Sequence, residues 1–261
     1  MMKVWKGIFH IHSNFSYDGK LPIEQIVKLC KKNGINFLIL TEHIYDRDKK
    51  EFMSDGKIES FIKECASFSE EDFHVVPAVE IPTPDNKIHI IGVGIKKPIN
   101  TDKLSTPLKI LSELKEKNCL TVLAHPLKNK AIAILKEEEL NMLNGIEIWN
   151  IKEEGRFIPD MQNYSSITKV ANRYKDMFCY AGIDFHLSEP LSAAEMIISA
   201  DIRSSDELLE IIKKGNFYFN GKFITFNSKG EIQKAPVSYI VYAFCKLLYG
   251  TKRILSKLRN R

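Results

Sequence analysis

The sequence predicts an α/β barrel, and three observations favour this fold class. Short apolar runs of strand length alternate with amphipathic helical segments about seven times along the 261 residues. Several runs are apolar at nearly every position, which is typical of parallel strands covered on both faces. Histidine or carboxylate side chains also stand at many strand ends. Barrel enzymes collect functional groups from many strand ends, whereas an open doubly wound sheet draws on fewer.

The first βα units carry clear signals. A strand at residues 4–9 leads into a turn that contains Gly19. A helix is expected at residues 21–34, where an early proline, apolar residues at intervals of three and four, and a terminal glycine agree. The apolar run at residues 35–40 is predicted to be a second, buried strand. The charged stretch 46–53 is predicted to be a loop.

The remaining segments continue this alternation. Further strands are expected at residues 73–80, 87–94, 120–124, 144–150 and 177–183. Helices are expected at residues 57–68, 104–118, 164–175 and 206–214. A closing hairpin is predicted over residues 217–226, with its turn at Asn220-Gly221, because this dipeptide is typical of two-residue turns.

The composition is that of a globular protein, with 44% hydrophobic and 27% charged residues. The N-terminal segment lacks the apolar core of a signal peptide, and no uncharged apolar run reaches eighteen residues. The five cysteines are scattered and form no C-x-x-C pair, which favours free thiols over disulfides or zinc fingers. We therefore expect a cytoplasmic protein.

The charge distribution divides the chain into two predicted parts. Residues 1–230, predicted to form the barrel domain, carry 31 basic and 32 acidic residues, which does not indicate a general nucleic-acid surface. Residues 231–261 carry seven basic residues and one acidic residue and are predicted to form a basic amphipathic segment. Three interpretations of this segment stay open: a helix packed on the barrel, a helix on an anionic membrane surface, and contact with RNA or DNA.

The candidate metal ligands are side chains at or near strand ends. They are His10, His12, Asp18, His43, Glu80, His89, His125, Asp184 and His186. Six of the seven histidines belong to this set, and only His74, at a strand start, lies outside it. His10 and His12 are expected to point the same way, because side chains on a strand alternate with a period of two.

The ligand types indicate the metal and the chemistry. Imidazole and carboxylate together suit zinc, manganese or iron. Nine candidates exceed what one ion takes, so we expect two or three divalent ions. Such a site lowers the pKa of a bound water and neutralises a phosphoryl group, which favours phosphoester hydrolysis.

The same residues resemble a known family. The motifs are His10-x-His12 with Asp18-Gly19, Thr41-Glu42-His43, Glu80 followed by His89-Ile-Ile-Gly, Ala124-His125-Pro126 and Gly182-Ile-Asp184-Phe-His186. In this order they resemble the PHP (polymerase and histidinol phosphatase) family over about residues 5–190. The resemblance implies a distorted (β/α)7 TIM-like barrel that holds up to three divalent ions.

The resemblance also implies how the ligands are shared. The three implied sets are His10, His12, Glu80 and Asp184; Glu80, His89 and His125; and Asp18, His43 and His186. Glu80, Asp184 and His186 would act through the metal cluster, in which a metal-bridging hydroxide attacks phosphorus in line. The chain departs from the family at Glu42, where aspartate is frequent, and Asp18 stands where either histidine or aspartate occurs.

The expected function is metal-dependent hydrolysis of a small phosphomonoester, such as a nucleotide or a sugar phosphate. A nuclease or phosphodiesterase and a non-catalytic PHP module that binds a partner are the alternatives. Arg47, Arg156 and Arg173 are candidates to hold the substrate, because arginine offers a bidentate fork, and Arg156 is preferred since it follows a strand end. Glu147 either supports a ligand or belongs to the core edge, and both interpretations stay open.

Overall fold

The computed structural model describes residues 3–155, 157–187, 189 and 191–233. The strands of its main sheet are β1 (Val4–Ile11), β2 (Phe37–His43), β5 (His74–Pro82), β6 (His89–Val93), β7 (Leu120–Leu123), β8 (Gly145–Asn150), β9 (Phe178–Gly182), β10 (Ala194–Ser199), β11 (Tyr218–Gly221) and β12 (Thr225–Asn227). The long helices are α1 (Ile23–Lys32), α2 (Asp55–Ser67), α3 (Pro107–Glu116), α7 (Met161–Ala171) and α8 (Ser205–Lys213). Each overlaps a helix that the sequence predicts.

Several short elements are not anticipated by the sequence patterns. They are the helices α4 (Ala131–Ile134), α5 (Glu137–Leu140) and α6 (Ile151–Glu154), and the 3-10 turns Thr101–Lys103 and Lys128–Lys130. The stretch predicted as a loop contains a small hairpin formed by β3 (Tyr45–Asp46) and β4 (Glu51–Phe52). Helices of one turn are too short to show a hydrophobic period, which explains why they escape prediction.

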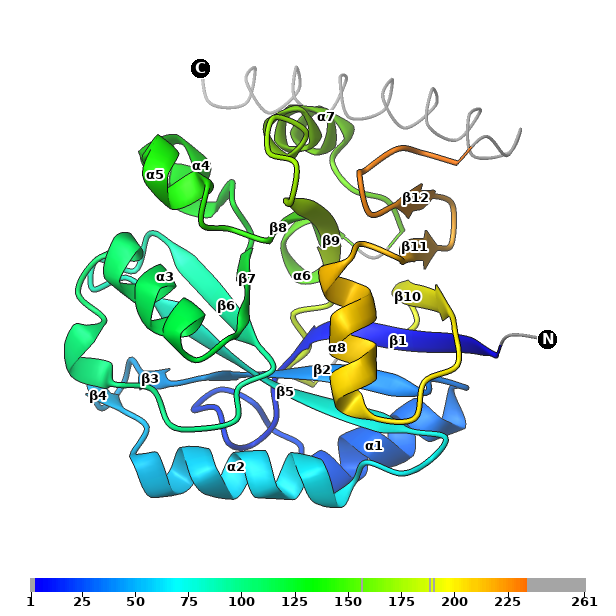
Figure 1. Ribbon diagram of the computed structural model, residues 1–261, viewed down its shortest axis with the longest axis horizontal. Helices are drawn as coiled ribbons and strands as arrows, with labels where there is room; N and C mark the ends of the chain where they lie inside the picture. The colour runs from blue at the N-terminus through cyan, green and yellow to red at the C-terminus, as the bar shows by residue number, and fades with distance from the viewer. Residues whose placement is uncertain (1–2, 156, 188, 190, 234–261) are drawn as a thin grey trace, which may run out of the picture.

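The ten strands curl into a nearly closed barrel with the helices on its outside (Figure 1). Their order is β12-β11-β10-β1-β2-β5-β6-β7-β8-β9. The barrel closes where the segment after β9 meets β1. The N–H of Ile183 donates to the carbonyl of Phe9 at 2.9 Å, and the N–H of His12 donates to the carbonyl of Phe185 at 2.9 Å. The predicted distorted α/β barrel is therefore confirmed.

One barrel strand runs against the predicted direction. β6 pairs antiparallel with both β5 and β7, whereas repeated βα units predict parallel neighbours throughout. The reversal follows from the short connection after β5, because a crossover to a parallel strand needs a longer segment. It places His89, the first residue of β6, opposite Pro82 at the end of β5. His89 thereby joins the carboxyl end of the barrel.

The C-terminal strands also differ from the prediction. β11 and β12 form a hairpin, but Gly221 lies within β11 and its N–H donates to the carbonyl of Ile224 at 2.8 Å, so the predicted turn at Asn220-Gly221 is wrong. β10, which pairs antiparallel with β1, was not expected, because its apolar centre spans only residues 196–198.

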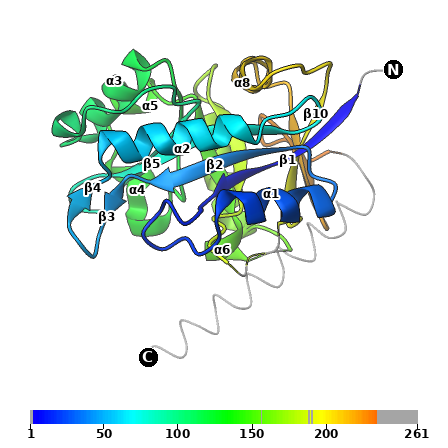
Figure 2. The ribbon, with the colours of Figure 1, turned by 90° about the horizontal axis from the view of Figure 1, so that it is seen from below.

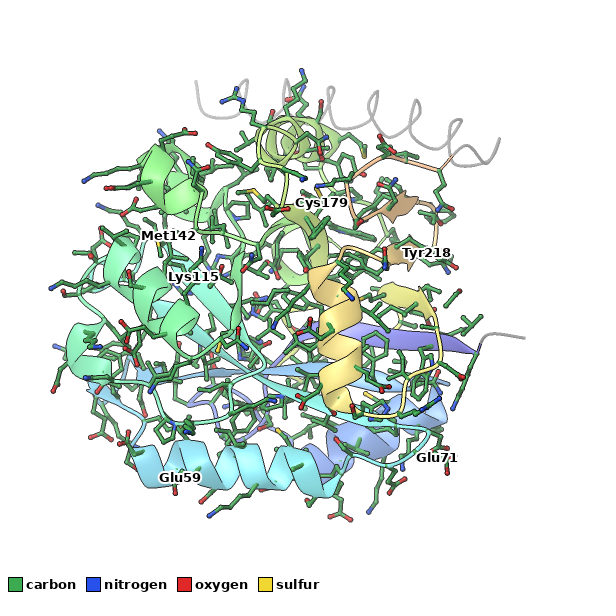
Figure 3. The ribbon with its side chains drawn as sticks, in the orientation of Figure 1. Glu59, Glu71, Lys115, Met142, Cys179 and Tyr218 are labelled. Carbon is green, nitrogen blue, oxygen red and sulfur yellow. The ribbon has the colours of Figure 1, made fainter. Side chains whose placement is uncertain are left out.

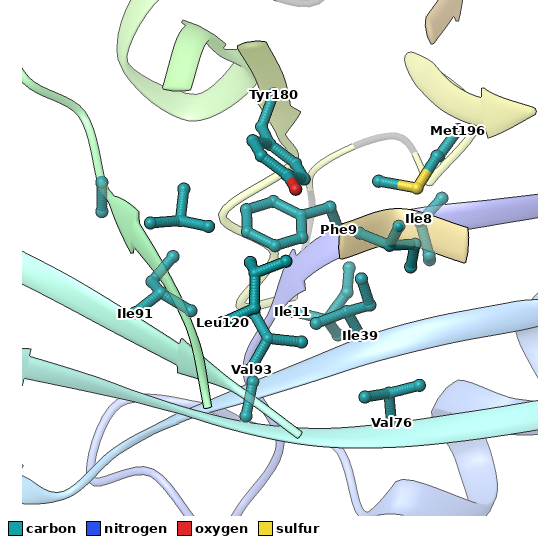
Figure 4. Packing of buried hydrophobic residues seen from close by; sticks show 14 of the residues in the cluster. Ile8, Phe9, Ile11, Ile39, Val76, Ile91, Val93, Leu120, Tyr180 and Met196 are labelled. Carbon is teal, nitrogen blue, oxygen red and sulfur yellow. The ribbon is translucent and has the colours of Figure 1, made fainter. Parts of the chain in front are cut away.

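The interior of the barrel is filled by apolar side chains from neighbouring strands (Figure 4). Those labelled are Ile8, Phe9, Ile11, Ile39, Val76, Ile91, Val93, Leu120, Tyr180 and Met196. Burial of each large aliphatic or aromatic side chain contributes about 1.5–3 kcal/mol. Seen from below, α1 and α2 cover β1 and β2 (Figure 2). Charged residues such as Glu59 and Glu71 lie at the periphery, whereas Cys179 is enclosed (Figure 3).

The other whole-chain predictions have mixed outcomes. The four cysteines in the described ranges, Cys30, Cys65, Cys119 and Cys179, are buried free thiols, as expected. Within those ranges no helix has both the length and the apolar character needed to cross a membrane. Residues 234–261 of the predicted basic segment lie outside the described residues, so the interpretations of that segment and the domain division at residue 230 stay predictions.

Candidate metal centre

The nine predicted ligands converge at the carboxyl end of the barrel. Three groups form in which the candidate ligand atoms of each group lie within 4.8 Å of one another. They are His12, His43 and His186; His10, His12 and Asp184; and Glu80, His89 and His125. The ninth residue, Asp18, has its Oδ2 atom 3.1 Å from Nε2 of His186. These groups overlap strongly with the ligand sets that the family resemblance implies, and His12 belongs to two of them.

Glu80 stands at the centre of this arrangement, at the end of β5, with 1% of its surface exposed. Its Oε2 atom lies 3.1 Å from Nε2 of His10 and 3.4 Å from Nδ1 of His43. Its Oε1 atom lies 2.6 Å from Nδ1 of His89 and 3.1 Å from Nε2 of His125. The two oxygens thus face two different histidine sets, which is the geometry expected of a carboxylate shared between ions.

Three ligands occupy strained backbone positions. The φ angle is +68° at His10, +27° at His125 and +53° at Asp184, in the region that non-glycine residues rarely adopt. His10 lies in a β-bulge, where the pairing with β2 shifts between Phe9 and Ile11. Regular strand alternation therefore does not explain why His10 and His12 converge. The bulge re-aims His10, and the two rings meet with centroids 5.0 Å apart.

Hydrogen bonds determine which nitrogen of each ring faces the centre. Nδ1 of His10 lies 2.7 Å from Oε1 of Glu147; a carboxylate only accepts, so this nitrogen carries the proton and Nε2 faces Glu80. The Ser16 hydroxyl donates to Glu42 at 2.5 Å and lies 3.3 Å from Nδ1 of His12. Its proton is already engaged, so Nδ1 of His12 donates to it and Nε2 is left for a metal.

Two further histidines are oriented in the same manner. Nε2 of His89 lies 3.0 Å from the side-chain oxygen of Asn86, which leaves Nδ1 toward Glu80. Nδ1 of His186 lies 2.9 Å from the carbonyl of Asp184, which leaves Nε2 toward Asp18. An ion bound to the nitrogens that face Glu80 and Asp18 would meet rings whose direction is already set.

Two buried polar atoms in the centre have no hydrogen-bond partner among the described residues. They are Nε2 of His12 and Oδ1 of Asp18. Buried polar groups without partners are rare, because each costs about 1–3 kcal/mol. A divalent cation bound by His12 and Asp18 would satisfy both atoms. The residues present therefore fit the metal ions that the family implies.

The charges of the centre suit cation binding. Burial raises the pKa of Glu80, but the surrounding histidines, His43 and His10 first, outweigh it and bring that pKa well below its usual value. The pKa of Asp184 is likewise well below normal, because His10 and His12 outweigh burial. Burial lowers the pKa of His43 to about 3. At His10 burial acts in the same direction, but the carboxylates of Glu147, Asp184 and Glu80 outweigh it and raise the pKa well above its usual value. Histidine binds metal through a deprotonated nitrogen, so a bound ion would displace the proton of His10 that faces the centre.

A buried carboxylate supports the turn that carries Asp18. Glu42, 0% exposed, accepts hydrogen bonds from the N–H of Ser13 at 3.0 Å, its hydroxyl at 2.6 Å and that of Ser16 at 2.5 Å. Its carboxylate spans the opening turn after β1. This explains how a residue next to His43 shapes the site without pointing at the metal.

The arginine predictions have different outcomes. Arg173 is exposed and follows α7, ahead of β9, whereas Asp184 follows the far end of that strand. It therefore lies at the opposite end of the barrel from the candidate ligands, and its predicted contact with substrate stays a prediction. Arg156 lies outside the described residues. Arg47 donates to the hydroxyl of Tyr17, whose ring centroid is 5.4 Å from that of His43.

Several residues that shape the site carry no strong sequence signal. Glu147, left undecided above, orients His10 and also accepts from the N–H of His125 at 2.8 Å. The Asn150 side chain donates to Glu147 at 3.1 Å, and its place at a strand end was the only available signal. Lys152, on α6, has its Nζ atom 3.1 Å from Nδ1 of His186, and no motif marks it.

Comparison with known proteins supports these observations. Among solved structures, the chain resembles a two-domain protein of Bacteroides vulgatus with a predicted PHP-like metal-dependent phosphoesterase, at a TM-score of 0.65 and 16% identity, covering 87% of this chain and 67% of that one. It also resembles the lesion-specific endonuclease EndoQ of Pyrococcus furiosus, at a TM-score of 0.53 and 13% identity, covering 86% of this chain and 59% of that one. Both likenesses concern the fold.

A curated protein matches over a shorter stretch. A "Probable histidinol-phosphatase" of Thermotoga maritima is 38% identical over 52 residues, which is 20% of this chain and 22% of that protein. The chain thus spans about a fifth of the length of this relative.

The fold and the candidate ligands define an α/β barrel with a histidine-rich cluster at the carboxyl ends of its strands. The chain belongs to the PHP domain family, whose model matches residues 9–221. That range contains all nine candidate ligands.

Proposed function

We propose that the chain is a phosphatase for a small phosphomonoester and works with two or three divalent ions. The observation that carries the proposal is the position of Glu80 between two histidine sets. Manganese, zinc or iron would suit these ligands. When bound, such ions supply a water of lowered pKa and neutralise charge on the phosphoryl group.

The protein itself would hold and orient the reacting groups. Hydrogen bonds that three ligand rings donate to Glu147, Ser16 and Asn86 orient these rings in advance, which lowers the cost of arranging the centre when substrate arrives. Glu80, Asp184 and His186 would act as ligands at the reacting end. The Tyr17 ring, tilted against that of His43 with the centroids 5.4 Å apart, would limit access of water on that side.

The surroundings of His43 support a small substrate. A cavity of about 230 Å³ lies beside this ring. Its walls include Phe15, Tyr17 and Phe52, and Lys57 lines it as well. A space of that size suits the alcohol part of a small ester better than a nucleic-acid strand. The same observation favours a phosphatase over a nuclease.

The decisive experiment compares classes of phosphate ester. Protein loaded with manganese is assayed against small phosphomonoesters, cyclic and linear phosphodiesters and DNA, beside a Glu80→Ala variant. We expect hydrolysis of monoesters, with loss of activity in Glu80→Ala. Preferential cleavage of DNA or diesters would establish the nuclease alternative instead. Less than one ion per chain after loading would favour a non-catalytic module.

A further inference from the structure

The ammonium group of Lys152 lies among the metal ligands. Its Nζ atom is 3.1 Å from Nδ1 and 3.3 Å from Nε2 of His186, and 3.6 Å from Oδ1 of Asp184. Lys152 belongs to α6, directly after β8, and its side chain is 38% exposed. It therefore enters the centre from the solvent side, where a substrate would also arrive.

The helix that carries Lys152 is tied to the site. The side chain of Asn150 caps α6 by accepting from the N–H of Glu153 at 3.1 Å. The amide nitrogen of the same side chain lies 3.1 Å from Oε2 of Glu147 and 3.4 Å from Oδ2 of Asp184. The single turn of α6 is thus anchored to two site carboxylates, which restricts where the stem of Lys152 can point.

Lys152 does not pair with the acidic residue next to it in the sequence. The adjacent Glu153 pairs instead with Lys128, at 2.8 Å. Across residues 3–155, 157–187, 189 and 191–233, the carboxylate within ion-pair distance of Lys152 is that of Asp184. Divalent ions held by Asp184 and His186 would repel the ammonium group, whereas the oxygens of a phosphoryl group would attract it. Lysine suits this task because its compact charge moves on a flexible stem.

We propose that Lys152 binds the phosphoryl group of the substrate and is a specificity-determining residue for phosphate esters. This inference rests on the proposed function. The ammonium would contact non-bridging phosphoryl oxygens on the side of His186, while the ions hold the opposite side. Its role is binding, so its loss should weaken the affinity for phosphate and leave the metal content unchanged.

The test measures phosphate binding without turnover. Isothermal titration calorimetry with inorganic phosphate is applied to the manganese-loaded wild type, Lys152→Met and Lys152→Arg. The matched control is Lys28→Met, which removes an exposed lysine of α1 that pairs with Glu24. We expect Lys152→Met to raise the Kd for phosphate roughly 10- to 100-fold, the range for one charged hydrogen bond. Lys152→Arg should restore much of the affinity, and Lys28→Met should match the wild type.

Three results would overturn the inference. The first is a Kd for phosphate in Lys152→Met equal to that of the wild type, and the second is no binding of phosphate by the wild type. The third is a gain of about one ion per chain in Lys152→Met, which would make the ammonium a built-in substitute for a metal ion. If the wild type binds phosphate through Lys152 but hydrolyses no ester, the proposed function alone fails. If the wild type hydrolyses monoesters and Lys152→Met keeps both the wild-type KM and the wild-type Kd for phosphate, this inference alone fails.

Discussion

His10 and Glu147 form a buried pair in which Nδ1 of the imidazole lies 2.7 Å from Oε1 of the carboxylate, with neither side chain exposed. Glu147 also holds the backbone of His125 through its other oxygen. One carboxylate on β8 thus orients ligands that come from β1 and from the end of β7. The candidate metal centre would depend on this pair, although Glu147 is not one of the nine candidate ligands.

We therefore expect Glu147→Gln to weaken metal binding. Loss of a carboxylate that orients a ligating histidine lowers metal affinity by about 10- to 100-fold. Competition with a chelator of known affinity measures this change. The matched control is Glu113→Gln, since Glu113 is also buried but lies on α3 and pairs with Lys103. Equal affinities in the two variants would contradict the orienting role.

The close packing of His10 and Glu147 leaves no room for a side chain at Gly182. A Cβ atom at this position would lie 1.9 Å from Oε1 of Glu147 and 3.2 Å from Cβ of His10. We expect Gly182→Ala to destabilise the protein by about 1–3 kcal/mol, the range for overpacking, and to weaken metal binding. Chemical denaturation measures the first effect. Gly56→Ala is the control, because nothing lies within 4 Å of that position in α2 and alanine is the better helix former.

Removal of the Glu42 carboxylate should destabilise the opening turn. Glu42→Ala deletes the acceptor of three hydrogen bonds and leaves the N–H of Ser13 unsatisfied in the interior. We expect a loss of about 2–4 kcal/mol in the free energy of unfolding. Urea denaturation provides the measurement. A loss below about 0.5 kcal/mol, typical of surface substitutions, would show that the carboxylate is dispensable.

The raised pKa of Glu154 predicts that the stability of the protein depends on pH. Burial raises the pKa of this carboxyl from 4.5 to about 8 in the folded protein. Between these values the folded state binds more protons than the unfolded state, so stability falls as the pH rises from about 5 to 8. Glu154→Gln removes this contribution and should show a higher Tm than the wild type at pH 8, with a smaller difference at pH 5. An identical pH profile would refute the raised pKa.

Metal binding should stabilise the fold. An ion that binds only the folded state adds RT ln(1 + [L]/Kd), about 2.7 kcal/mol at a hundredfold excess over Kd. We expect the Tm to rise when manganese is added and to return when a chelator is added. Glu80→Gln should reduce this shift, because Glu80 faces both histidine sets. A Tm that is independent of metal would argue against a site that is formed by the folded barrel.

Much of the fold was accessible from local patterns. Periodicity located the five long helices, because each has an apolar face and end signals of its own. The direction of β6 and the existence of β10 were not accessible, because both depend on pairing with distant strands. The position of the closing turn was misplaced for the same reason: the hairpin register is set by pairing with β10, not by Asn220-Gly221 alone.

By itself, the sequence determined that nine ligand-type side chains stand at or near strand ends, and it predicted a metal centre on an α/β barrel. Tertiary structure decided how those side chains meet. The bulge at His10, the reversed β6 that delivers His89, and the contact of Glu147 with His10 join residues far apart in the chain. Local propensity cannot encode such contacts, because they arise only when the barrel closes and brings the strand ends together.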